Sequence, residues 1–147
     1  MKVVPLLSIL LGSAIAVNSI NSAIASPDHS GSHHHHHEAV MVPENAPVPS
    51  VTLELIPDIK QGWNLQIITE NFDFAPATVN QDSNINAGHA HFYINGEKIT
   101  RLYGHWYYIE ELPSGTHTLT VTLNTNRHED ILYEGELIQA SVSVTVP

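Results

Sequence analysis

Histidine is the residue type with which this sequence could do chemistry. The chain has 147 residues, and 11 of them are histidine. Neutral imidazole is the commonest protein ligand for metal ions and suits copper, zinc and nickel. Cysteine is absent, which excludes disulfides, thiolate zinc sites and blue-copper centres. The composition therefore favours metal binding by imidazole.

The densest group of histidines is a run of five near the N-terminus. It consists of His33, His34, His35, His36 and His37. Such a tract binds divalent late-transition metals in many interchangeable geometries, without a fixed site. The alternative is an expression tag, which would also bind metal in a test tube. The run alone therefore predicts metal capture without identifying its purpose.

A more specific pair of histidines, His89 and His91, lies on a predicted strand. Residues two apart on a strand point to the same face, with their Cα atoms about 6 to 7 Å apart. Phe92 is predicted to face the core, so the two imidazoles face the other way and can reach one ion. The alternative is a pair of ordinary exposed polar residues.

Three further histidines follow in the chain. His128 comes just past the end of a predicted strand and could approach the pair as a third ligand from a loop. The alternative is a solvated loop histidine. His105, after Gly104, is a weaker candidate for a fourth ligand, and the alternative is a histidine packed on aromatic residues. His117 shares the strand parity of Leu119 and Val121, which predicts a structural histidine at the edge of the core.

Period-two alternation predicts the elements that position these residues. It begins at Val51 and recurs in short segments with turns between them, and no 3.6-residue apolar stripe is found. Asn95-Gly96 is a strong signal for a two-residue hairpin. Residues 51–147 are therefore predicted to be an all-β domain, an antiparallel β-sandwich of about seven strands and immunoglobulin-like type. The predicted strands cover residues 51–56, 63–67, 88–95, 97–103, 105–109, 117–123 and 138–146.

The first 50 residues have a different composition. Residues 3–17 are apolar but short for a bilayer span, which takes about 20 residues. Ala23-Ile24-Ala25 follows with a small-x-small cleavage pattern, so residues 1–25 are predicted to be a cleaved signal peptide. A retained membrane anchor is the alternative. Residues 26–50 are predicted to be a disordered linker rich in His and Pro. We therefore expect a periplasmic or extracellular protein without a membrane anchor after cleavage.

The charge narrows the class of partner. Five Lys and Arg residues stand against 15 Asp and Glu residues, so the formal net charge is −10. Such a surface argues against nucleic acid and anionic lipid as partners. The sequence has no Ser-His-Asp order, no His-Glu-x-x-His motif and no phosphate loop, so we predict that the protein is not an enzyme. A three-histidine zinc or copper site with catalytic activity is the alternative.

Several segments of residues 51–147 together resemble small exported bacterial domains of largely unassigned function. The segments are Gly88-His89-Ala90-His91, Asn95-Gly96, Arg101-Leu102-Tyr103-Gly104 and Asn124-Thr125-Asn126-Arg127-His128. The resemblance implies an immunoglobulin-like or cupredoxin-like sandwich and an association with periplasmic metal handling. It also groups His89, His91 and His128. His105 departs from the pattern, which has Pro or a similar residue there, and this marks it as a local addition.

These observations predict an exported metal-binding protein. It would capture or buffer Cu(II) or Zn(II) through the His-rich linker and a site formed by His89, His91 and His128, and the affinity order favours Cu(II). The alternative is a non-catalytic module that binds proteins or glycans. Its platform would be Trp63, Trp106, Tyr107 and Tyr108, although we expect these rings to pack in the core.

Overall fold

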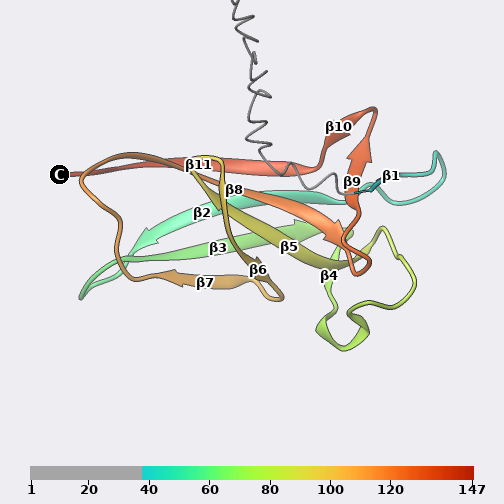
Figure 1. The fold of residues 1–147 in the computed structure, drawn as a ribbon, viewed down its shortest axis with the longest axis horizontal. Helices are drawn as coiled ribbons and strands as arrows, with labels where there is room; N and C mark the ends of the chain where they lie inside the picture. The colour runs from blue at the N-terminus through green and yellow to red at the C-terminus, as the bar shows by residue number, and fades with distance from the viewer. Residues whose placement is uncertain (1–37) are drawn as a thin grey trace, which may run out of the picture. The chain divides into compact units, whose positions relative to one another are not determined.

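The alternating pattern produces eleven strands among residues 38–147, the part of the chain that the computed structural model describes (Figure 1). The predicted signal peptide and the five-histidine run lie outside these residues. The only helical element in the described part is a 3-10 turn, η1 (Pro76–Thr78). No helix in this part is long and apolar enough to cross a membrane.

The strands form two sheets. The larger sheet has the order β1 (Ala39–Met41), β9 (Asp130–Tyr133), β8 (Gly115–Thr125), β5 (Ala87–Ile94) and β4 (Asp73–Phe74). Three more strands join it: β10 (Glu136–Leu137) pairs with β9, β11 (Gln139–Val146) with β8 and β6 (Glu97–Leu102) with β5. The smaller sheet contains β2 (Ser50–Pro57), β3 (Trp63–Glu70) and β7 (Trp106–Ile109).

One hydrophobic core lies between the two sheets. Alternate residues of each strand point inward, so each strand contributes one apolar face. Fully buried members of the core are Leu65 and Ile67 of β3, Ala90 and Phe92 of β5, Leu119, Val121 and Leu123 of β8, and Ile131 of β9. Strand β5 lies between β6 and β8 in the larger sheet. The residues of β5 therefore sit in the interior of this sheet and not at its edge.

The structure confirms an all-β fold and corrects two details of the prediction. Two strand pairs, β1 with β9 and β4 with β5, are parallel, so the sheet is mixed and not purely antiparallel. The described residues also contain more strands than the seven predicted. The additional strands β1, β4, β9 and β10 have only two to four residues, which is too short for an alternating pattern to be visible in the sequence.

The last part of the linker predicted for residues 26–50 contains a strand. Strand β1 pairs Val40 with Ile131 of β9, and the Val42 backbone continues this pairing by donating to the Leu132 carbonyl oxygen at 2.8 Å. The side chain of Val42 is buried. The folded part therefore begins before Val51. The composition of 25 residues taken together does not reveal the three residues of β1, because their partner strand lies almost a hundred positions away in the sequence.

The predicted hairpin at Asn95-Gly96 is confirmed. Asn95 and Gly96 have φ angles of 52° and 84°, and they join Ile94 of β5 to Glu97 of β6. Two successive residues with positive φ are the requirement of a type I′ turn, and Asn-Gly adopts it at low cost. The hairpin places β6 beside the strand that carries His89 and His91.

Candidate metal centre

Strand β5 positions His89 and His91 on the face of the larger sheet opposite to Phe92, as the spacing predicts. Across the strand pair, His91 lies opposite Thr122 of β8 and His89 lies opposite Asn124. Both imidazoles are fully buried, although they lie on the face that turns away from the core. This burial excludes the alternative of two exposed polar residues.

Gly88 explains how the start of β5 comes close to β8. A Cβ atom added to Gly88 would lie 2.1 Å from the carbonyl oxygen of Asn124 and 3.1 Å from the Cα of Thr125. No side chain fits there, so glycine is required for this close approach. The contact sets His89 next to the end of β8, where the turn to β9 begins.

The turn between β8 and β9 brings His128 over β5. The backbone N–H of His128 donates to the carbonyl oxygen of Thr125 at 2.9 Å. The Thr125 hydroxyl accepts from the N–H groups of Arg127 and Glu129 and donates to Glu129 Oε2 at 2.6 Å. His128 has a φ of 70°, a left-handed conformation that reverses the chain. Local hydrogen bonds therefore fix the backbone conformation of the turn that carries the third imidazole.

Asn126 fixes this turn to the segment around η1. It is 2% exposed, and its side-chain amide donates to the Ala75 carbonyl oxygen at 2.7 Å and to the Thr78 hydroxyl at 2.8 Å. The Asn80 N–H donates to the Asn126 carbonyl oxygen at 3.0 Å. These bonds span about 50 residues of sequence, so the position of His128 depends on tertiary structure.

The three imidazoles converge through one ring nitrogen each. His89 Nε2 lies 3.0 Å from His91 Nε2 and 3.2 Å from His128 Nδ1. The three ligand atoms all lie within 4.8 Å of one another. A tetrahedral ion with nitrogen ligands at about 2.0 to 2.1 Å separates those nitrogens by about 3.3 Å. The donor set and its spacing fit a late-transition-metal ion.

The outer ring nitrogen of His128 has a partner that favours metal binding through Nδ1. His128 Nε2–H donates to Asn80 Oδ1 at 3.2 Å. With its proton on Nε2, the neutral ring presents the Nδ1 lone pair to His89. Metal-binding histidines usually have such an outer hydrogen bond, which orients the ring. On the other side of the group, the Tyr103 ring lies against His89 with centroids 5.3 Å apart.

The environment keeps His89 uncharged at neutral pH. Burial lowers the pKa of His89 from 6.5 to about 4, and the neighbouring His128 acts in the same direction. The Asn126 side chain acts in the opposite direction, and Arg101 and Lys98 lower this pKa further. A neutral imidazole is the form that binds metal, because the imidazolium has no lone pair to offer.

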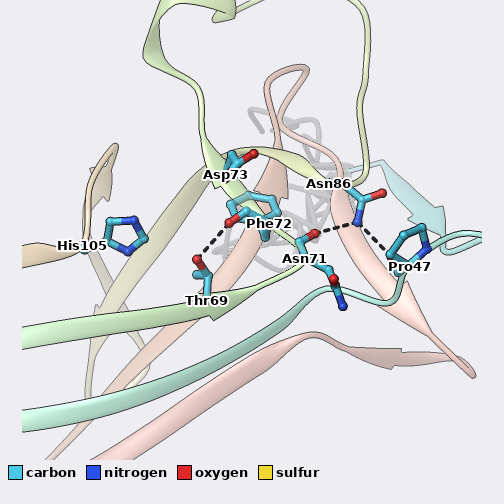
Figure 2. Close-up of a pocket in the computed structure, with 7 residues that line it drawn as sticks. All are labelled: Pro47, Thr69, Asn71, Phe72, Asp73, Asn86 and His105. Carbon is cyan, nitrogen blue, oxygen red and sulfur yellow. Dashed lines mark hydrogen bonds between the residues drawn. The ribbon is translucent and has the colours of Figure 1, made fainter.

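His105, the weaker candidate ligand, does not join this group. Its Nδ1–H donates to the Ile67 carbonyl oxygen at 2.9 Å, and its ring packs edge-on against Phe74 with centroids 5.0 Å apart. It borders a separate pocket of about 510 Å³ at the end of β3. Figure 2 shows His105 on one side of this pocket, with Asn71, Asn86 and Pro47 on the other. His105 therefore has a structural role: it joins the segment after Gly104 to β3 and to Phe74.

His117 is structural, as predicted. It is 8% exposed, and its Nε2–H donates to the Pro113 carbonyl oxygen at 2.8 Å. Its Nδ1 accepts from the side-chain amide of Asn95 at 3.1 Å. Asn95 also accepts from the Thr118 N–H at 2.9 Å. The Nδ1 of His117 thus holds the β5–β6 hairpin beside β8, and its Nε2 holds the segment that leads into β8.

The aromatic residues divide into two groups, which corrects the prediction that all four pack in the core. Trp63 and Tyr107 are partly buried against the core. Trp106 and Tyr108 of β7 are 57% and 48% exposed, and they alternate with Tyr107, so they share the outer face of the smaller sheet. Core packing explains only half of this cluster.

Sequence reasoning missed the residues that support the three histidines. Asn126 belongs to the segment Asn124-Thr125-Asn126-Arg127-His128, so its position near a ligand was a signal. Asn80 lies in a loop 48 residues from His128, and nothing in its neighbourhood indicates a role. A contact made only by folding cannot be read from local pattern.

Comparison of the chain with protein-family models, with curated proteins and with solved structures gave no significant match.

Proposed function

We propose that this protein binds one Cu(II) or Zn(II) ion at His89, His91 and His128 and acts as an exported metal-binding protein. The observation that carries the proposal is the convergence of three ring nitrogens, at 3.0 and 3.2 Å, from two buried imidazoles and one half-buried imidazole. A nitrogen donor set without sulfur or carboxylate suits Cu(II) and Zn(II), and the general affinity order favours Cu(II).

The metal would also contribute to stability. An ion held by three buried or half-buried side chains binds the folded chain in preference to the unfolded one. At a hundredfold excess over its dissociation constant it would stabilise the fold by about 2.7 kcal/mol. In this proposal the run from His33 to His37 collects ions, and the three-histidine site holds one. We do not assign a catalytic reaction to the protein.

Export and family remain parts of the proposal. The apolar run of residues 3–17 and the pattern Ala23-Ile24-Ala25 support a cleaved signal peptide and a periplasmic or extracellular location. The two-sheet fold supports the assignment to immunoglobulin-like or cupredoxin-like domains. Mass spectrometry of the exported protein should find Ser26 as its first residue, and an intact Met1 in a membrane fraction would contradict cleavage.

The test of the metal site uses the full chain with His29 and His33 to His37 replaced by serine, so that the linker does not bind metal. Metal analysis and calorimetry should find one Cu(II) or Zn(II) per chain. The electron paramagnetic resonance spectrum of the Cu(II) form should show coupling to nitrogen ligands.

His91→Gln and His128→Gln should each lower the affinity at least tenfold and abolish the rise in melting temperature on metal addition. His105→Gln is the matched control and should leave both unchanged, because His105 lies outside the group. An affinity that is equal in all three variants would show that the ion binds elsewhere.

A second candidate function is favoured by the exposure of Trp106 and Tyr108. Two aromatic rings on one outer sheet face can stack on the apolar faces of sugar rings. This face also carries Gln66, opposite Trp106, and Asn64, opposite Tyr108. Titration of the protein with soluble polysaccharides, read by tryptophan fluorescence, tests this function. Trp106→Ala should abolish any response, and Trp63→Phe should preserve it.

A further inference from the structure

Basic residues are scarce in this chain, and three of them lie on or next to the elements that carry the three histidines. Residues 38–147 contain only four Lys or Arg residues, against fourteen Asp or Glu residues. Lys98 and Arg101 lie on β6, which pairs with β5, and Arg127 directly precedes His128. The fourth, Lys60, lies in the turn between β2 and β3, at the other end of the sheets from β4 and β9 (Figure 1).

Strand register places Arg101 and Lys98 on the same face as the histidines. Arg101 lies directly opposite His91, and Lys98 lies directly opposite Tyr93. Residues that face each other across a strand pair project to the same side of the sheet. Both positive charges also act on His89. Arg101 and Lys98 therefore belong electrostatically to the surroundings of the three-histidine group.

The carboxylates near this group are engaged elsewhere. Asp130 is the carboxylate that acts on Lys98, and its Oδ1 accepts from the Asn124 amide at 2.6 Å. The side chain of Glu129 accepts from the hydroxyl groups of Ser83 and Thr125. The candidate ligand group in the described part of the chain contains no Asp or Glu. Residues 38–147 thus provide no negative ligand in this group.

This arrangement leaves an excess of positive charge at the metal. Three neutral imidazoles do not reduce the charge of a divalent ion. Arg101 and Lys98, whose side chains are exposed, add positive charge beside it, and Asp130 balances part of the charge of Lys98. A divalent ion held by two buried imidazoles and no carboxylate keeps a positive charge that is costly to bury. Three protein ligands also leave a coordination position for an exogenous ligand. A small anion would satisfy both the charge and the coordination.

The same sheet face has a hollow farther along β5 from His91, and its lining includes neither the three histidines nor Arg101 and Lys98. A hollow of about 300 Å³ is lined by Tyr93, Gly96, Thr120, Thr122, Leu137 and Gln139. Tyr93 lies two positions from His91 on β5, and Thr122 lies opposite His91 on β8. The hollow is small and partly apolar, which suits a small carboxylate better than a large polyanion.

We infer that the metal centre takes a small oxyanion of the carboxylate type as an additional ligand, and that Arg101 and Lys98 recognise it. This inference rests on the proposed function, because the anion binds through the metal. The protein would then hold the ion together with the anion, and its ligand would be a metal–carboxylate pair.

The test uses the full chain with His29 and His33 to His37 replaced by serine, loaded with one equivalent of Cu(II). Azide is the first probe, because its charge-transfer absorption appears when it binds Cu(II). Acetate is the second probe and should compete with azide. Arg101→Gln and Lys98→Gln should each raise the dissociation constant of azide by about 3- to 10-fold at low salt, with copper stoichiometry unchanged.

Lys60→Gln makes the same charge change far from the site and should leave azide binding unchanged. Equal azide affinity in all variants, or copper uptake without an azide band, would overturn the inference while the proposed function stands. Failure of the parent chain to take up copper would overturn the proposed function and the inference with it.

Discussion

At the scale of single residues, His89 is the centre of the site. Its Nε2 contacts a ring nitrogen of both other histidines, and its ring is covered by Tyr103. Burial keeps this imidazole neutral, so its lone pair is available to an ion at neutral pH. As a result, the unfolded chain binds a proton at His89 in mild acid and the folded chain does not, which lowers the free energy of unfolding there.

The stability of the metal-free protein should therefore depend on pH. The pKa of His89 is about 4 in the folded chain, against an ordinary value of 6.5. The contribution of His89 is complete above pH 6.5 and is lost as the pH falls towards 4, because the unfolded chain then binds the additional proton. Its size is at most about 3 kcal/mol, at about 1.4 kcal/mol per pKa unit.

Urea unfolding between pH 4 and pH 8, without metal, measures this dependence. His89→Gln should flatten the curve in this range. A variant that keeps the wild-type slope would show that other groups cause it.

The second prediction at this scale concerns Asn80. Asn80→Gly removes the acceptor of the His128 Nε2–H and keeps a residue that tolerates the φ of 62° found there. Loss of an outer hydrogen bond to a metal-binding histidine should lower metal affinity by about 10- to 100-fold. Calorimetry with Zn(II) measures the change.

Asn71→Gly is the matched control, because Asn71 is also exposed and has a φ of 54°. It should leave the affinity unchanged. If both variants lose affinity equally, the effect belongs to loop flexibility and not to the hydrogen bond.

At the scale of elements, the site depends on the close pairing of β5 with β8. Seven residue pairs join the two strands, from Gly88 with Thr125 to Ile94 with Leu119. The strands carry His89 and His91 on one side, and the turn that follows β8 carries His128. A change that separates the strands at Gly88 should therefore disturb both the fold and the ligand group.

Gly88→Ala tests this dependence. The added Cβ would lie 2.1 Å from the Asn124 carbonyl oxygen, and backbone atoms cannot give way as a flexible side chain can. We expect a loss of at least about 3 kcal/mol in the free energy of unfolding, or failure to fold. Gly104→Ala is the control, since no atom lies within 4 Å of its added Cβ, and it should change stability by less than about 1 kcal/mol. Comparable losses in the two variants would contradict the role of close strand approach.

At the scale of the whole molecule, the folded unit includes residues before Val51. Strand β1 covers the edge of β9, and the Asp130 N–H donates to the Glu38 carbonyl oxygen at 2.8 Å. Because β9 follows the His128 turn directly, β1 also supports the strand on the far side of the metal site.

Truncation should reveal this contribution. A chain that starts at Glu38 should unfold at the same urea concentration as the full metal-free protein. A chain that starts at Ser50 should be less stable by about 2 kcal/mol or more, because it loses the β1 pairing and the buried Val42. Equal stability of the two truncated chains would show that β1 is dispensable.

The strand character of the domain, the hairpin at Asn95-Gly96 and the shared face of His89 and His91 could all be predicted from local sequence. These features depend on local chain geometry, in which residue parity on a strand and the φ preference of Asn and Gly decide the outcome. The role of His117 followed in the same way from the parity of its strand.

The burial of these two histidines, the approach of His128 and the separation of His105 from the group depend on long-range contacts. His128 reaches His89 because Asn126 ties the β8–β9 turn to Ala75 and Thr78. His105 is held instead by the Ile67 carbonyl oxygen on β3. Each of these contacts joins residues 38 to 51 positions apart. Local patterns in the sequence contain no information about such distant pairs, because chain folding alone brings their atoms within hydrogen-bonding distance.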